Sequence, residues 1–124
     1  MAKARNVEER CAQILRWLES EYPCGRTVVL SWRKELGKGK IHWDGETTRE
    51  GSVLRIILSR KSCRQWRYAI DTLIHEYAHC IQWGMAKTET HEKLKHHPAA
   101  FWAQYGEISD RFNHDHGAEE SKEF

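Results

Sequence analysis

The sequence predicts a single α+β domain over residues 1–124. Helical periodicity occurs near both ends of the chain, and short runs of β-forming residues lie between them. The connections between these runs are too short to contain crossover helices, so we expect a three-stranded antiparallel sheet. The expected order is an N-terminal helix, three strands and two further helices. A chain of this length can bury a hydrophobic core without disulfide bonds.

The first helix is expected over residues 3–21, where apolar residues recur at helical spacing between charged ones. Pro23 and Gly25 end it. Three strand candidates follow, of which the second lies after a glycine-rich connection and before an Asp44-Gly45 turn signal. These candidates are Arg26–Arg33, Lys38–Trp43 and Ser52–Ser59.

The second helix is expected over Arg64–Trp83, with Gly84 closing it. A polar stretch at Lys87–His96 is expected to be a loop. The third helix begins at Pro98, a residue suited to the first helical position. The chain after Asn113 is polar, and we expect it to fray, most clearly over residues 114–124.

Composition excludes several classes of protein. Hydrophobic residues make up 40% and charged residues 31%, which is too apolar for a disordered chain. No apolar run approaches the roughly 20 residues of a membrane span, and the N-terminus is charged where a signal peptide would be apolar. A cytoplasmic, monomeric protein is expected. Its four cysteines form no C-x-x-C pair and are expected to be free, structural thiols.

Charge is distributed unevenly along the chain. Residues 1–67 contain 15 Lys and Arg against 8 Asp and Glu, a formal charge of +7. Residues 68–124 contain 5 against 10, a formal charge of −5. The basic N-terminal half is therefore a candidate for contact with DNA, and an ordinary solvated surface is the alternative.

The segment that most clearly indicates a chemical function is the H-E-x-x-H motif, at His75, Glu76 and His79. Residues four apart lie on the same face of a helix, so the two imidazoles can converge on one metal ion. Glu76 lies beside this pair, where it can act on a water molecule at the metal. We expect one Zn²⁺ per chain, with His75 and His79 as ligands and Glu76 as the catalytic acid and base.

A catalytic zinc site commonly takes three protein ligands. His97 is the preferred third ligand, because Pro98 pushes it out of helical geometry at a helix entrance that Phe101 anchors. His96 and Glu107 are the main alternatives. More distant candidates are His91, His114 and His116.

Three segments resemble the zincin metallopeptidases, and among them the SprT-like, YgjP and WLM-type families. They are Leu36-Gly37-x-Gly39, Leu73-Ile74-His75-Glu76-Tyr77-Ala78-His79 and His97-x-x-x-Phe101-Trp102. The resemblance covers residues 26–112. It implies a minimal zincin-like domain, metal histidines at His75, His79 and His97, and the catalytic acid at Glu76. The zinc ribbon that many SprT-like proteins carry has no counterpart in this sequence.

The expected function is zinc-dependent hydrolysis of a protein or peptide substrate, possible targets being proteins associated with nucleic acid. Glu76 takes a proton from the attacking water and delivers it to the leaving amine. Two alternatives stay open: a nucleic-acid-binding module with a structural zinc, and a zinc hydrolase of non-peptide substrates. The sequence does not select the oxyanion donor, for which Tyr105, His96, His91 and Arg111 are candidates.

Overall fold

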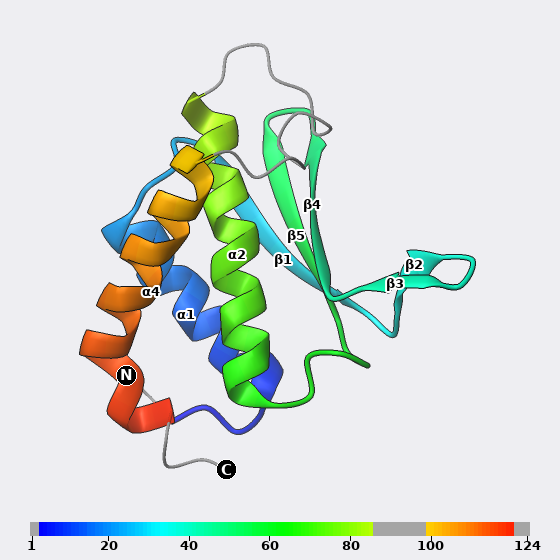
Figure 1. Cartoon of the computed structure of the whole chain (residues 1–124), viewed down its shortest axis with the longest axis horizontal. Helices are drawn as coiled ribbons and strands as arrows, with labels where there is room; N and C mark the ends of the chain where they lie inside the picture. Colours follow the sequence, from blue (N-terminus) through cyan, green and yellow to red (C-terminus); the bar gives the residue numbers. More distant parts are fainter. Residues whose placement is uncertain (1–2, 86–98, 121–124) are drawn as a thin grey trace.

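Three helices and five strands make up the part of the chain that the computed structural model describes, residues 3–85 and 99–120. The mixed α+β composition agrees with the prediction. Figure 1 shows the helices gathered on one side of a small sheet. In chain order the elements are α1 (Val7–Glu21), β1 (Thr27–Arg33), β2 (Leu36–Lys38), β3 (Ile41–Trp43), β4 (Gly45–Glu50), β5 (Val53–Ser59), α2 (Trp66–Met85) and α4 (Ala99–Glu120).

The main sheet has three strands in the order β1-β5-β4. β4 and β5 are antiparallel, with Gly45 opposite Leu58, and a turn at Gly51 (φ 64°) joins them. β1 and β5 are parallel, with Thr27 opposite Val53, so the prediction of an antiparallel sheet is wrong for this pair. The connection needs no helix because residues 34–52 form three further strands that return the chain to the same end of the sheet.

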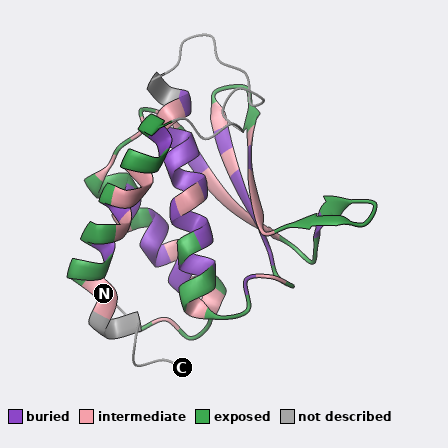
Figure 2. Cartoon of the chain, in the orientation of Figure 1, coloured by how far each residue is buried: buried purple, intermediate pink, exposed green. Residues whose placement is uncertain are grey.

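The predicted strand Lys38–Trp43 is also wrong as a single element. The chain turns within it, so that β2 and β3 form a separate antiparallel hairpin in which Leu36 pairs with Trp43. This hairpin extends away from the rest of the molecule (Figure 1), and Figure 2 shows it almost wholly exposed. The third strand of the main sheet is β4, which begins where the sequence indicated only a turn.

The helix boundaries have local causes. α1 begins at Val7, not residue 3, because the Asn6 side chain accepts a 2.8 Å hydrogen bond from the Glu9 amide and caps the helix there. α2 begins two residues after the predicted start at Arg64 and ends two residues after Trp83. Gly84 therefore lies inside the helix, and the prediction that it closes the helix is wrong. The predicted start of the last helix at Pro98 and the loop at Lys87–His96 lie outside the described residues.

α4 continues to Glu120, although the sequence predicted fraying after Asn113. The reason is packing of the next turn against α1. The rings of Phe112 and His116 lie 5.8 and 5.4 Å from the Trp17 ring, both in edge-to-face contact. This second contact extends the packed part of the helix beyond the predicted end.

α2 is the central element, because it contacts α1, α4, β4 and β5. Its Leu73 and Tyr77 are fully buried in a core that includes Leu54, Ile56 and Leu58 of β5. The four cysteines are free, as predicted, and only Cys24 is not fully buried. No helix in the described ranges combines the length and apolar character that crossing a membrane requires.

Candidate metal site on α2

His75, Glu76 and His79 lie together on α2, where each offers one ligand atom and these atoms lie within 4.8 Å of one another. The i, i+4 spacing of the histidines produces this convergence, as the sequence predicted. Glu76 is 6% exposed and His79 is 8% exposed, whereas His75 is half-buried. Two imidazoles and a carboxylate are donors suited to a transition metal such as zinc. The group can therefore hold a metal ion.

The Glu76 carboxyl is held by β4. Thr47 Oγ1 lies 2.8 Å from Glu76 Oε1 and 3.3 Å from the Glu76 carbonyl oxygen. Burial raises the pKa of Glu76 to about 7, and nearby Glu46 and Asp44 add to this, while the hydrogen bond from Thr47 opposes it. A carboxyl with this pKa exchanges protons near neutral pH.

Sequence reasoning missed the contribution of β4 to this site. Thr47 and Glu76 are 29 residues apart, and no local pattern brings them together. The adjacent β-branched residues Thr47 and Thr48 were the available signal for a strand, although a weak one.

The first turns of α4 form an aromatic wall beside the two histidines. Phe101 is fully buried, and its ring stacks on His79 at a centroid distance of 4.4 Å. The rings of Phe101, Trp102 and Tyr105 lie 5.0, 6.1 and 5.8 Å from that of His75. The expectation that Phe101 anchors this end of the helix agrees with its burial. Trp102 is half exposed and marks the outer edge of the wall.

Two of the oxyanion-donor candidates are engaged elsewhere. The Tyr105 hydroxyl donates a hydrogen bond to Asp71, and burial together with this carboxylate raises the pKa of Tyr105 to about 12. Arg111 forms a 2.9 Å ion pair with Glu21 of α1. His91 and His96, the other two candidates, lie outside the described residues.

His97, the predicted third metal ligand, also lies outside the described residues, as does its alternative His96. Glu107 is exposed on α4, accepts a 3.3 Å hydrogen bond from Gln104, and does not belong to the His75–Glu76–His79 group. His114 is exposed beside Asp115, and His116 packs against Trp17. Of the predicted site residues, the structure therefore brings together His75, Glu76 and His79.

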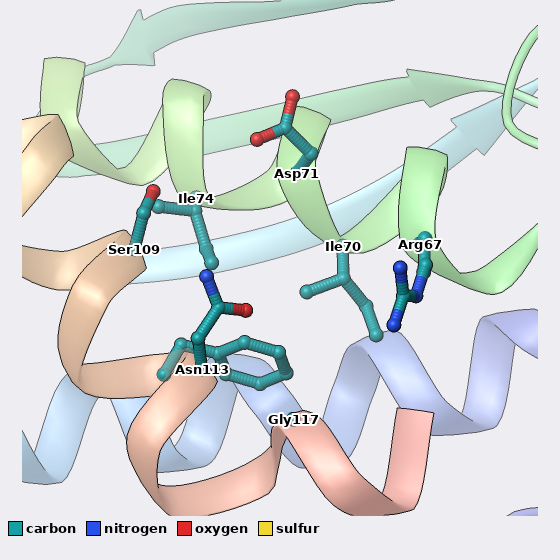
Figure 3. A pocket seen from close by; sticks show the side chains of 8 residues that line it. Arg67, Ile70, Asp71, Ile74, Ser109, Asn113 and Gly117 are labelled. Atoms are coloured by element: carbon teal, nitrogen blue, oxygen red, sulfur yellow. The ribbon is translucent and has the colours of Figure 1, made fainter. Parts of the chain in front are cut away.

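A cavity of about 460 Å³ lies between α2 and α4 (Figure 3). Arg67 and Asp71 of α2 and Ser109 and Asn113 of α4 supply its polar lining, and Ile70, Ile74 and Phe112 its apolar part. None of the three site side chains lines it. In the described part of the chain, the cavity and the candidate metal site are therefore separate features.

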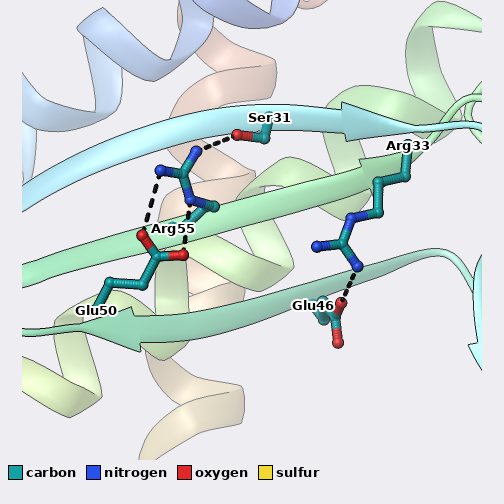
Figure 4. Close-up of polar contacts among 5 residues, drawn as sticks. All are labelled: Ser31, Arg33, Glu46, Glu50 and Arg55. Atoms are coloured by element: carbon teal, nitrogen blue, oxygen red, sulfur yellow. Dashed lines mark hydrogen bonds and ion pairs between the residues drawn. The ribbon is translucent and has the colours of Figure 1, made fainter.

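The sheet face turned away from α2 carries charged side chains that are paired (Figure 4). Arg55 bonds both carboxylate oxygens of Glu50, at 3.1 and 3.3 Å, and also donates to Ser31. Arg33 lies 4.0 Å from Glu46. Acidic neighbours thus offset part of the positive charge of the N-terminal half at these positions.

No protein-family model, curated protein or solved structure matches the chain.

Proposed function

We propose that the protein is a zinc-dependent metallopeptidase of zincin-like design, in which His75 and His79 hold the metal and Glu76 transfers protons. The observation that carries this proposal is the convergence of the three side chains, with ligand atoms within 4.8 Å of one another. The resemblance of the Leu73–His79 segment to the zincins selects the peptide bond as the substrate. His97 is proposed as the third ligand on the same resemblance.

The donor set and its surroundings fit zinc. Imidazole nitrogens such as those of His75 and His79 are ordinary zinc donors, and the site lies against the core, beside the buried Phe101 ring. Zinc bound there would supply Lewis acidity, which polarises a substrate carbonyl and makes a water molecule more acidic.

Glu76 supplies the proton transfers. Its carboxylate accepts a proton from the attacking water, so that one O–H bond of the water breaks and one forms on Glu76. The same proton then passes to the nitrogen of the leaving amine as the C–N bond breaks. The raised pKa of Glu76, about 7, favours both directions of transfer near neutral pH. The aromatic wall of α4 limits the access of water on the side of the two histidines.

Substitution of Glu76 by Gln tests this role. Glutamine has nearly the same shape but cannot accept a proton, so kcat should fall about 10²- to 10⁴-fold while the zinc content stays at one ion per chain. Hydrolysis is measured with fluorogenic peptides and an unfolded protein substrate, and zinc by elemental analysis.

Glu50→Gln is the matched control, because Glu50 lies on β4 but on the outer sheet face, paired with Arg55. It should retain wild-type activity. Full activity in the Glu76→Gln variant, or activity that survives complete removal of the metal, would show that the proposed function is wrong.

A further inference from the structure

We infer that β4 positions the Glu76 carboxylate: Thr47 holds Oε1 and Gly45 provides the space for Cγ, so that Oε2 is the oxygen that transfers the proton. This inference rests on the proposed function of Glu76. Thr47 is thus a positioning residue, because it acts through Glu76 and not on the substrate.

The hydroxyl of Thr47 is directed to the carboxylate by distance and by charge. Thr47 is 0% exposed, so water does not compete for its proton. A hydroxyl has one proton, and the contact to Glu76 Oε1 is 2.8 Å against 3.3 Å to the carbonyl oxygen. Hydrogen bonds to an ionised carboxylate are also stronger than bonds to a neutral carbonyl. Oε1 is therefore the preferred acceptor.

Gly45 supplies the second half of the arrangement. It lies two residues before Thr47, so both positions of β4 belong to the same face of the sheet. A Cβ atom added at Gly45 would lie 3.2 Å from Glu76 Cγ, 2.9 Å from Thr72 Cγ2 and 3.1 Å from Leu58 Cδ2. Any larger residue would displace the Glu76 side chain or separate β4 from α2.

Together these contacts restrict the carboxylate to one orientation. Cγ lies against the Gly45 backbone, and Oε1 is fixed by Thr47, which keeps its own proton throughout. Oε2 then takes the proton from the water, and the same atom releases it to the leaving amine. Preorganisation of this kind favours catalysis because the reacting oxygen already occupies its position before the proton is transferred.

Thr47→Val and Thr47→Ser separate the hydroxyl from the volume of the side chain. Valine keeps the shape and removes the donor, so we expect kcat to fall about 10- to 100-fold with KM and zinc content unchanged. Serine keeps the donor and should restore kcat to near the wild-type value. Wild-type kcat in Thr47→Val, or an equal loss in Thr47→Ser, would overturn the inference.

A measurement without turnover distinguishes this inference from the proposed function. In the metal-free protein, the Thr47 hydroxyl proton should exchange slowly in NMR spectra and show nuclear Overhauser contacts to the Glu76 γ-protons. Their absence overturns the inference even if Glu76→Gln abolishes hydrolysis. Their presence in a protein that hydrolyses no peptide supports the positioning of Glu76 and rejects the proposed function.

Gly45→Ala tests the space for Cγ in the same spectra. It should weaken those contacts, whereas Gly106→Ala, whose added Cβ meets no atom within 4 Å, should leave them unchanged. Unchanged contacts in a folded Gly45→Ala protein would show that Gly45 does not provide the space for Glu76 Cγ. If that variant does not fold, the comparison of Thr47→Val with Thr47→Ser still tests the inference.

Discussion

Glu76 is a carboxyl group whose ionisation opposes folding. Burial raises its pKa from 4.5 to about 7 in the folded, metal-free protein, while the unfolded chain leaves it in water. The folded state therefore binds the proton more tightly than the unfolded state. The stability that this provides is fully present below pH 4.5 and is lost as the pH rises through 7.

This linkage predicts a pH-dependent effect of Glu76→Gln on the metal-free protein. Glutamine does not ionise, so the variant should gain stability relative to wild type between pH 4.5 and 7, reaching about 3 kcal/mol above pH 7. Urea unfolding of both proteins at several pH values measures the difference. Glu50→Gln, at an exposed position of β4, is the control. A difference that does not change with pH would contradict the assigned burial of the Glu76 charge.

Residues within one helix were the ones that the sequence predicted well. His75, Glu76 and His79 could be placed on one face because helix geometry alone determines the relation between i and i+4. Thr47 and Gly45 could not, because their contact with Glu76 depends on how β4 packs on α2. Phe101 could be predicted only in part, since its helical spacing predicted its burial but not its stacking on His79.

Among the elements, α1, β1, β5 and α2 carry apolar patterns in the sequence and were predicted within a few residues. β4 has the sequence Gly-Glu-Thr-Thr-Arg-Glu, in which the inward positions are Gly45 and Thr47 and no apolar residue alternates with the polar ones. It was missed because its inner face packs on the Glu76 side chain, where a small and a polar residue replace the usual apolar ones. Packing of β4 on a carboxyl side chain thus removed the alternating apolar pattern that predicts strands.

α4 contains a glycine that its packing does not require. Gly106 lies inside the helix, and an added Cβ would have no atom within 4 Å outside the local backbone. Because alanine loses less backbone freedom on folding, Gly106→Ala should stabilise the protein by about 1 kcal/mol and raise Tm by roughly 4 °C. Thermal unfolding followed by circular dichroism measures this. A lower Tm would show that Gly106 has a packing role.

At the scale of the whole molecule, the candidate metal site lies where several helices and strands meet. α2 contacts the sheet on one side and α4 on another, and His79 and Glu76 are buried between these elements. Such a site exists only when the domain is folded, because Thr47, Glu76 and Phe101 come from three different elements. Metal binding at this site would therefore be coupled to the folding of the entire domain, and not only of α2.

This coupling predicts that zinc raises the stability of the whole protein. A ligand that binds only the folded state at 1,000 times its Kd contributes about 4 kcal/mol, which corresponds to a Tm increase of about 10 °C or more for a chain of this size. A chelator should reverse the increase, and a single cooperative transition should persist in both states. Scanning calorimetry with and without zinc measures both effects.

His79→Ala removes one ligand and should abolish most of the zinc-dependent increase, whereas His42→Ala, on the exposed β3 strand, should retain it. The two variants remove the same side chain from a buried and an exposed position, so the comparison separates specific binding from zinc attachment at surface histidines. An equal Tm increase in both variants would place the metal elsewhere on the molecule. Without the metal on α2, the role of Glu76 in proton transfer would lose its physical basis as well.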